Sequence, residues 1–233
     1  MSKDERVRTE RMNVAIDGPA GAGKSTVARR VAGELGYVYV DTGAMYRAVT
    51  LAALRQGIEP DEADKLKALV ASIRIELKPG EQGQTVYLNG EDVTEAIRSR
   101  EVTLIVSPLA ANESVRAKLV ELQRTMASER GIVMDGRDIG TQVLPDAELK
   151  IFLTASVQIR AQRRYQELPE GQRIPLTQLE AEIAERDRSD EQREISPLIC
   201  AKDAIVVDSS ELTIDEVVAV IIDLSRSKLA EAK

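Results

Sequence analysis

Gly18-Pro19-Ala20-Gly21-Ala22-Gly23-Lys24-Ser25 matches the pattern G-x-x-x-x-G-K-[ST], in which a glycine-rich loop joins a strand to a helix. The apolar run Met12–Ile16 before it predicts the strand. After it, apolar residues recur at helical spacing from Val27 to Leu35, and Gly36 stands where a helix would end. Strand, loop and helix therefore occur in the order that a nucleoside triphosphate site requires. A glycine-rich turn with an exposed lysine is the alternative, and the flanking segments disfavour it.

The residue types of this loop explain how it would bind phosphate. Glycines let backbone N–H groups approach phosphate oxygens, and the dipole of the helix that begins at Lys24 adds to the attraction. Lys24 supplies a point charge for the β and γ phosphates, and the Ser25 hydroxyl is the expected ligand of a bridging magnesium ion. The predicted nucleotide-binding residues are Gly18, Pro19, Ala20, Gly21, Ala22, Gly23, Lys24, Ser25 and Thr26.

The composition excludes several classes of protein. The 233 residues are 43% hydrophobic, which suffices for a packed core. No apolar run approaches the roughly 18 residues of a membrane span, and residues 1–11 are polar and charged, so we expect a cytoplasmic protein without a membrane partner. Cys200 is the single cysteine, which excludes an intramolecular disulfide. A formal net charge of -7 and few aromatic residues argue against binding a nucleic-acid polymer.

The chain contains no histidine, which removes the commonest general base and every Ser-His or Cys-His pair. Phosphoryl transfer to a phosphate acceptor needs no imidazole, because the attacking oxygen is already ionised. Catalysis then consists mostly of positioning and charge neutralisation. The missing histidine therefore favours transfer to a phosphate.

Short apolar runs alternate with helix-sized segments along the chain. This alternation is typical of a parallel sheet covered by helices on both faces, so we predict a three-layer α/β fold with a five-stranded parallel sheet. The predicted strands are 12–16, 37–40, 131–134, 149–153 and 204–207. Polar residues follow each run, and because the carboxyl ends of parallel strands meet at one edge, these residues should line one crevice.

One segment departs from the alternation. Ile73–Leu77 alternates between apolar and polar residues, Pro79–Gly83 is a cluster of turn residues, and Asn89-Gly90 is a strong hairpin signal. These patterns predict a small antiparallel β insert, and the sequence leaves open whether it serves the site or is only a hairpin. The predicted division is a polar extension 1–11, a core 12–65 and 99–233, and the insert 66–98.

Two helical patterns carry arginines. Asn112 is a plausible cap of a helix that runs to Ala127, in which Arg116 stands beside the apolar stripe. A helix over Val157–Glu167 places Arg160, Arg163 and Arg164 on one face. A loop and a second charged helix, from about Pro175 to Arg188, follow it. Two charged helices joined by a loop suit a mobile lid, over about 157–188.

The acids and arginines near the predicted crevice leave alternatives open. Arg137 directly follows a buried-strand pattern, whereas arginines on helices are as often solvated surface. Asp135 ends a strand where enzymes with this loop place a magnesium-linked carboxylate, and Asp138 could equally accept hydrogen bonds from a substrate amino group. The residues themselves leave the roles of these two acids unresolved.

Four motifs together resemble the bacterial-type cytidylate kinases. They are Ile-Asp-Gly-Pro-Ala-Gly-Ala-Gly-Lys-Ser-Thr (16–26), Asp-Thr-Gly-Ala-Met-Tyr-Arg (41–47), Asp-Gly-Arg-Asp-Ile-Gly-Thr (135–141) and Glu-Arg-Asp-x-x-Asp (185–190). The first motif is generic, whereas the second and third together are specific to that family, and the resemblance covers nearly the whole chain from Met12. The predicted insert also resembles the family's enlarged monophosphate-binding region.

The resemblance implies transfer of the γ-phosphoryl group of ATP to CMP or dCMP, with magnesium, on a P-loop fold that we expect to act as a monomer. It implies that Lys24, Arg137 and the lid arginines Arg160, Arg163 and Arg164 are catalytic. The residues implied for the acceptor phosphate are Thr42, Arg47, Arg137 and Arg186, those for the cytosine edge are Ser107, Arg116 and Asp138, and those for the ribose are Asp190 and Arg193. The chain departs from many relatives at Thr42, where they have serine, and from some at Ser189, where they have arginine.

Two rival functions fit the sequence less well. Another small-molecule kinase, such as an adenylate or shikimate kinase, would share the loop, but the chain lacks the Asp-Gly-Phe-Pro-Arg signature of the first and has a hairpin insert that the second lacks. A nucleotide-dependent switch would need an Asn-Lys-x-Asp or Leu-Ser-Gly-Gly-Gln signature, and neither occurs. Arginines within the chain also favour transfer over timed hydrolysis.

Overall fold

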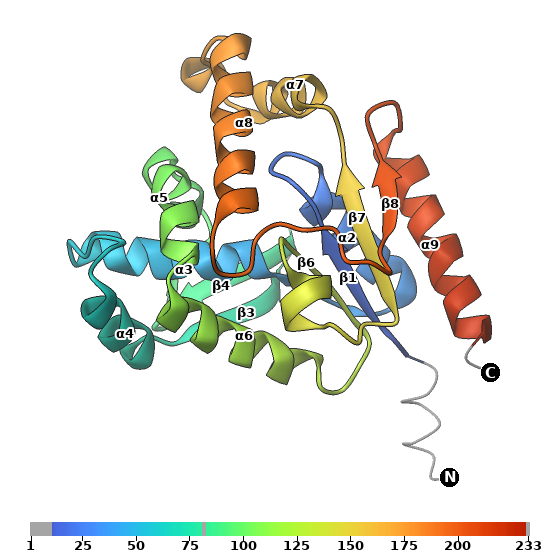
Figure 1. Ribbon diagram of the computed structural model, residues 1–233, viewed down its shortest axis with the longest axis horizontal. Coiled ribbons are helices and arrows are strands. Elements are labelled where there is room, and N and C mark those ends of the chain that lie inside the picture. Colours follow the sequence, from blue (N-terminus) through green and yellow to red (C-terminus); the bar gives the residue numbers. More distant parts are fainter. Residues whose placement is uncertain (1–10, 81–82, 232–233) are drawn as a thin grey trace.

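The computed structural model describes residues 11–80 and 83–231, in which helices cover both faces of a parallel sheet (Figure 1). The strands are β1 (Asn13–Asp17), β2 (Val38–Asp41), β6 (Ile132–Gly136), β7 (Leu149–Thr154) and β8 (Ile205–Asp208), in the spatial order β2-β6-β1-β7-β8. Every neighbouring pair is parallel. The predicted α/β fold with a five-stranded parallel sheet is confirmed.

The strands extend further than their apolar runs. Asp17, Asp41, Thr154 and Asp208 each form the last residue of a strand, although polarity predicted them to lie just beyond it. Backbone pairing continues to these residues because hydrogen bonds between strands do not depend on side-chain polarity. The polar side chains are therefore held by the rigid sheet itself, at its carboxyl edge.

Alternate residues of the central strands face two separate cores. The helices are α2 (Lys24–Leu35), α3 (Thr42–Arg55), α4 (Ala63–Ser72), α5 (Arg100–Ala110), α6 (Glu113–Ala127), α7 (Val157–Glu167), α8 (Leu176–Gln192) and α9 (Ile214–Glu231). Val14 and Ile16 of β1 pack with α2 and α9, whereas Ala15 packs on the opposite side with α3 and α6. These two cores fix the sheet between helical layers, and the site is built on the carboxyl edge that the layers leave open.

Glycines set both ends of α2, as the sequence predicts. Gly23 precedes Lys24 with φ 86°, and Gly36 ends the helix with φ 65°, both in the left-handed region that favours glycine. Gly18 has a stricter requirement. A Cβ atom there would lie 1.9 Å from the carbonyl oxygen of Leu153 in β7, so the loop can leave β1 only without a side chain.

The predicted insert contains the antiparallel sheet formed by β3 (Ile75–Gly80), β4 (Gly83–Leu88) and β5 (Glu91–Asp92). Asn89 and Gly90 both have positive φ, which confirms the tight hairpin turn. Residues 66–72 of the predicted insert are not strand: they belong to α4, whose buried Leu66, Leu69 and Val70 recur at helical spacing. Residues 81–82 of the predicted turn and residues 1–10 of the predicted extension lie outside the described residues.

Gln84 of the insert closes the free edge of β2. Its side-chain oxygen accepts the N–H of Asp41 at 3.0 Å, and its side-chain nitrogen donates to the carbonyl oxygen of Tyr39 at 2.7 Å. These two bonds imitate the pairing that another strand would supply. The insert is therefore attached to the strand that ends beside the candidate site.

The two helices predicted for the lid are confirmed as α7 and α8, and α8 runs to Gln192, beyond the predicted end. A turn, η3 (Glu170–Gln172), lies between them. Ala161 of α7 packs on Leu179 and Ile183 of α8 in a small apolar cluster of their own. In Figure 1 this pair stands above the carboxyl edge of the sheet. The movement of the lid stays a prediction.

We expect Gly18→Ala to lower the free energy of unfolding by roughly 1–3 kcal/mol, because the added methyl group would press on β7. Gly33→Ala is the matched control, since no atom lies within 4 Å of a Cβ atom at this exposed helical position. The control should gain about 0.5–1 kcal/mol. Urea unfolding of both variants measures the difference, and equal stabilities would contradict the close contact at Leu153.

Candidate active site

Lys24 lies buried beneath the glycine-rich loop. Its ammonium nitrogen donates to the carbonyl oxygen of Pro19 at 2.7 Å, which holds the lysine across the loop. Burial and the nearby positive charges of Arg137 and Arg186 lower the pKa of Lys24 well below its usual value. An anion bound in the loop would offset both effects, which suits a phosphate-binding lysine.

Ser25 and Asp135 present adjacent oxygen atoms beside the loop. The Ser25 hydroxyl donates to one carboxylate oxygen of Asp135 at 2.9 Å, and the Tyr39 hydroxyl donates to the other at 2.9 Å. Burial, together with the charge of Asp41, raises the pKa of Asp135 to about 7. Mg²⁺ in nucleotide sites takes one or two protein oxygens besides phosphates and waters. The chemistry of this pair therefore fits a magnesium ion bound with a nucleotide.

Cationic side chains from four elements converge near Lys24. Burial and the positive charges of its neighbours lower the pKa of Arg186 to about 9, and burial lowers that of Arg47 to about 10. Arg137 and Arg164 are among the cations that repel these two side chains, and the Nε atom of Arg186 is buried without a hydrogen-bond partner. This group of Lys24, Arg47, Arg137, Arg164 and Arg186, called the cation cluster below, is suited to binding more than one phosphate.

Two acids border the cation cluster, from α8 and from the loop after β6. Asp190 accepts from Nε of Arg137 at 2.8 Å and from the Ser107 hydroxyl at 2.8 Å, so it joins α8 to α5. Asp138 forms a buried ion pair with Arg116, and Arg193 lies 3.8 Å from its other oxygen. Burial raises the pKa of Asp138 despite these two arginines. The structure thus brings Asp138, Arg116 and Arg193 into one buried polar group, and Ser107 and Asp190 into a second.

Two residues implied for the acceptor phosphate form hydrogen bonds within the protein. The Thr42 hydroxyl donates to the carbonyl oxygen of Asp135 at 2.7 Å. Arg47 donates to the carbonyl oxygen of Ile97 at 3.1 Å and to the hydroxyl of Thr103 at 2.8 Å. The Thr42 hydroxyl has a single proton, so it would have to leave this carbonyl oxygen to donate to a phosphate, whereas the two bonds of Arg47 use only one of its three nitrogens.

The three predicted lid arginines have different hydrogen-bond and ion-pair partners. Arg160 is buried and donates to Ala20 of the glycine-rich loop at 2.9 Å while it pairs with Asp187 of α8 at 2.7 Å. Arg163 donates to the side chain and backbone of Ser209 at 3.0 and 2.6 Å. Arg164, the member of the cation cluster on this helix, is partly exposed and pairs with Glu167 at 3.5 Å. With successive arginines, one helix therefore contacts the loop and the end of β8 and supplies a member of the cluster.

Sequence reasoning missed Tyr39, Tyr46, Gln84 and Asp17. Arg116 lies over the ring of Tyr46, 5.5 Å from its centroid, although this tyrosine lies inside a quoted motif. Burial raises the pKa of Asp17 to about 6, although the hydrogen bonds that its carboxylate accepts from two backbone N–H groups act in the opposite direction. Asp17 was visible as a polar strand end. Nothing in the sequence indicated Tyr39 or Gln84, because their partners lie far away in the chain.

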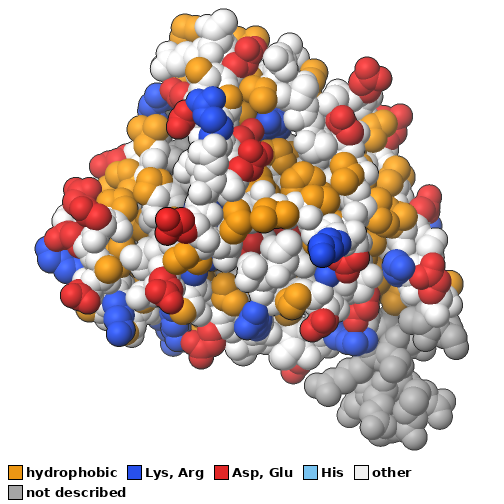
Figure 2. Space-filling model, in the orientation of Figure 1, with side chains coloured by type: hydrophobic (Ala, Val, Ile, Leu, Met, Phe, Trp, Pro, Cys, Tyr) orange, Lys and Arg blue, Asp and Glu red, His pale blue; other side chains and the backbone are white. Residues whose placement is uncertain are grey.

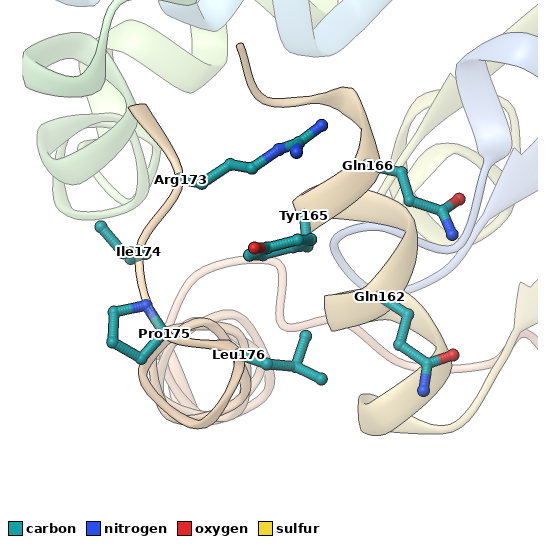
Figure 3. A pocket seen from close by; sticks show the side chains of 7 residues that line it. All are labelled: Gln162, Tyr165, Gln166, Arg173, Ile174, Pro175 and Leu176. Carbon is teal, nitrogen blue, oxygen red and sulfur yellow. The ribbon is translucent and has the colours of Figure 1, made fainter. Parts of the chain in front are cut away.

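One groove borders Ser25, Tyr39 and Gln84, and a second lies on the lid. A polar groove of about 320 Å³ opens from Ser25 toward the insert. It is lined by Ser25, Thr26, Arg29, Tyr39, Asp41, Ala44, Gln84, Thr85, Val86, Thr94, Glu95 and Arg98. A groove of about 490 Å³ lies on the lid, where Figure 3 shows Arg173 reaching toward Tyr165. Since Gln162 and Tyr165 lie on the face of α7 away from Arg160, this second groove is separate from the cation cluster.

Apolar side chains gather on a different face. Figure 2 shows them over β7, β8 and the segment that leads into β8. The exposed apolar residues of this region are Ile195, Ile199, Ile205 and Val206. None of the predicted site residues belongs to this group.

Residues 14–227 match the cytidylate kinase family. The chain belongs to this family. A cytidylate kinase from Exiguobacterium sibiricum is 54% identical over 221 residues, which cover 94% of this chain and 99% of the relative. A cytidylate kinase from Ligilactobacillus salivarius is 55% identical over 216 residues, which cover 92% of this chain and 96% of the relative. The predicted cytidylate kinase resemblance is confirmed.

The cytidylate kinase chain also has structural neighbours at low sequence identity. A solved protein from Eubacterium ventriosum, described as uncharacterized, is 11% identical with a TM-score of 0.51, and the match covers 93% of this chain and 99% of that one. The likeness extends to the fold alone. Among residues 11–80 and 83–231, no helix combines the length and the apolar character that a membrane span requires.

The cation cluster of this cytidylate kinase lowers the stability of the folded protein when no ligand is bound. The folded state binds the proton of Arg186 less tightly than the unfolded chain does, so the charge of Arg186 destabilises the ligand-free fold at neutral pH. We expect Arg186→Gln to stabilise the ligand-free protein by about 1 kcal/mol, or about 2–4 °C in Tm. Calorimetry with and without CMP should show that this variant gains less stability from the ligand.

Arg188→Gln serves as the control for this prediction. Arg188 lies on the same helix, is exposed, and pairs with Glu185 three residues away. Its replacement should change stability by less than about 0.5 kcal/mol. A fall in Tm of Arg186→Gln, with Arg188→Gln unchanged, would contradict the repulsion.

Proposed function

We propose that this protein transfers the γ-phosphoryl group of ATP to the phosphate of CMP and of dCMP, which yields ADP and CDP or dCDP. The observation that carries the proposal is the cation cluster between the glycine-rich loop and the buried Asp138. An oxygen of the acceptor phosphate forms a bond to the γ phosphorus, and the bond from that phosphorus to the bridging oxygen breaks. The bridging oxygen keeps the electron pair and leaves on ADP.

The donor half of the proposed site is the loop with Lys24 and Ser25. Backbone N–H groups of the loop and the start of α2 would bind the β and γ phosphates of ATP. Ser25, held by Asp135, would hold the magnesium ion, whose charge helps to neutralise the phosphates. Lys24 would leave Pro19 and bind the phosphate oxygens as charge moves onto ADP.

The acceptor half uses the remaining cations. Arg137, Arg186 and Arg47 would bind the phosphate of CMP, and Thr42 would contact it through its hydroxyl. Arg164 is the lid arginine whose charge acts on Arg186, so it is suited to the transferring group. Arg160 and Arg163 would hold the lid against the glycine-rich loop and the end of β8.

Asp138 is proposed to select the base. Its carboxylate would accept from the amino group of cytosine, while Arg116 donates to the acceptor atoms of the ring. Uracil has a carbonyl oxygen in place of that amino group, so it would face the carboxylate without a proton to share. Ser107, Asp190 and Arg193 would hold the ribose and its orientation. We propose that the protein acts as a monomer, with the whole of this site in one chain.

The experiment mixes protein, MgATP and each of CMP, dCMP, UMP, AMP and shikimate, and measures the formation of ADP. CMP and dCMP should stimulate ADP formation most strongly. Stimulation by AMP or shikimate alone would support another small-molecule kinase, and ADP formation that ignores every acceptor would support a switch. Lys24→Ala should lower kcat by roughly 100-fold or more, and an unchanged kcat would contradict the donor half.

We expect Asp138→Asn to raise KM for CMP by roughly tenfold or more, with KM for ATP changed little. The amide keeps the volume but loses the charge that pairs with Arg116, and it can donate to uracil. The preference for CMP over UMP should therefore fall. Steady-state kinetics with both acceptors measures it, and equal changes in both Michaelis constants would refute selection of the base by Asp138.

A further inference from the structure

Asp17 connects two loops that the proposed reaction must align. It is the last residue of β1, so Gly18 and the glycine-rich loop follow it directly. Its side chain is buried, and its two carboxylate oxygens accept the N–H of Ile139 at 2.8 Å and the N–H of Gly140 at 2.7 Å. One side chain at the root of the donor loop thus binds the backbone of a second loop.

That second loop carries the acceptor residues. Ile139 and Gly140 begin a π-helical turn, η2 (Ile139–Val143), directly after Arg137 and Asp138. Pairing between β1 and β6 ends with Asp17 opposite Gly136, so the residues that follow have left the sheet. The bonds of Asp17 therefore continue the attachment to β1 beyond the last backbone pair.

Little room is left around Gly140. A Cβ atom there would lie 3.2 Å from Cδ of Lys150, which is tight, and 3.4 Å from the Asp17 carboxylate, which is the lower end of ordinary contact. Burying a carboxylate is costly, and an apolar residue at this position would avoid that cost. The acid instead supplies two acceptors for the N–H groups of a turn.

We propose that Asp17 is a positioning residue for phosphoryl transfer: it fixes the loop with Arg137 and Asp138 relative to the glycine-rich loop. The acceptor phosphate then lies in line with the γ phosphate. Asp17 acts through the backbone of the turn and binds neither substrate. This inference rests on the proposed function, because it assigns a role within the same reaction.

Asp17→Asn tests the inference with little change in volume. The amide has one acceptor oxygen, so its NH₂ group would face one of the two N–H groups, and the turn should shift. We expect kcat/KM for CMP to fall roughly tenfold or more. The Kd for MgADP, measured by calorimetry, should change less than about twofold, because backbone pairs with β6 and β7 still hold β1. A purely structural role would lower Tm and leave both constants of the folded enzyme unchanged.

Glu148→Gln is the matched control. Glu148 accepts the N–H of Asn13 at 2.8 Å, so it is a carboxylate bonded to the backbone of the same strand at the opposite end. Its kinetic constants should equal those of the unchanged protein. Gly140→Ala changes the residue that donates to Asp17, and it is the deciding variant if Asp17→Asn fails to fold. For Gly140→Ala, kcat/KM for CMP should fall roughly threefold or more, again with MgADP binding retained.

The outcomes separate two failures. If the unchanged protein phosphorylates CMP and the folded variants keep kcat/KM within twofold, the role of Asp17 is overturned. Equal losses for CMP and MgADP would also overturn it, since Asp17 would then only shape the glycine-rich loop. If the unchanged protein prefers another acceptor, the proposed function fails, and the same variants are judged with that acceptor.

Discussion

Repulsion among positive charges is the constraint on which this structure depends. Burial, and after it the positive charge of Arg137, lower the pKa values of Lys24 and Arg186. Such an arrangement cannot assemble through its own interactions. The two apolar cores on either side of the sheet hold it, because they fix strands whose carboxyl ends converge. Substrate anions then complete the electrostatic balance of the fold.

The acids around the cation cluster offset only part of its positive charge, and the one that pairs with a member of the cluster is Asp190. Asp190 is occupied by Arg137 and Ser107, and Asp138 is turned toward Arg116 and Arg193. Asp135 is bonded by two hydroxyl groups instead of a cation. Each acid thus has a local partner, and the positive potential in front of Lys24 remains for phosphates. The absence of histidine from the sequence is consistent with chemistry that works through this potential.

Local patterns predicted the strands, the glycine-rich loop and the main helices because periodicity and glycine conformation act within a few residues. The same reasoning missed α4, whose three buried residues were counted as part of the β insert. It grouped Arg160, Arg163 and Arg164 by helical spacing, and the structure shows that their partners differ. Contacts such as Asp17 with Ile139 join residues more than a hundred positions apart. A single sequence has no local signal for such contacts, so they became apparent only in the folded structure.

Through Gln84, the insert covers part of the edge of the main sheet, besides any part that it has in catalysis. An edge strand with free N–H and carbonyl groups is a template for pairing with another chain, and this side chain occupies the carbonyl oxygen of Tyr39 and the N–H of Asp41 on the outer side of β2. Shortening the insert to a plain loop would leave these two backbone groups of β2 without a hydrogen-bond partner from Gln84, whatever happened to substrate binding. Because Ile75, Val86 and Leu88 of the insert also belong to the apolar core on one side of the sheet, its removal would expose core residues as well as the edge. A replacement amide would therefore restore the edge of β2 and leave the core to be repacked.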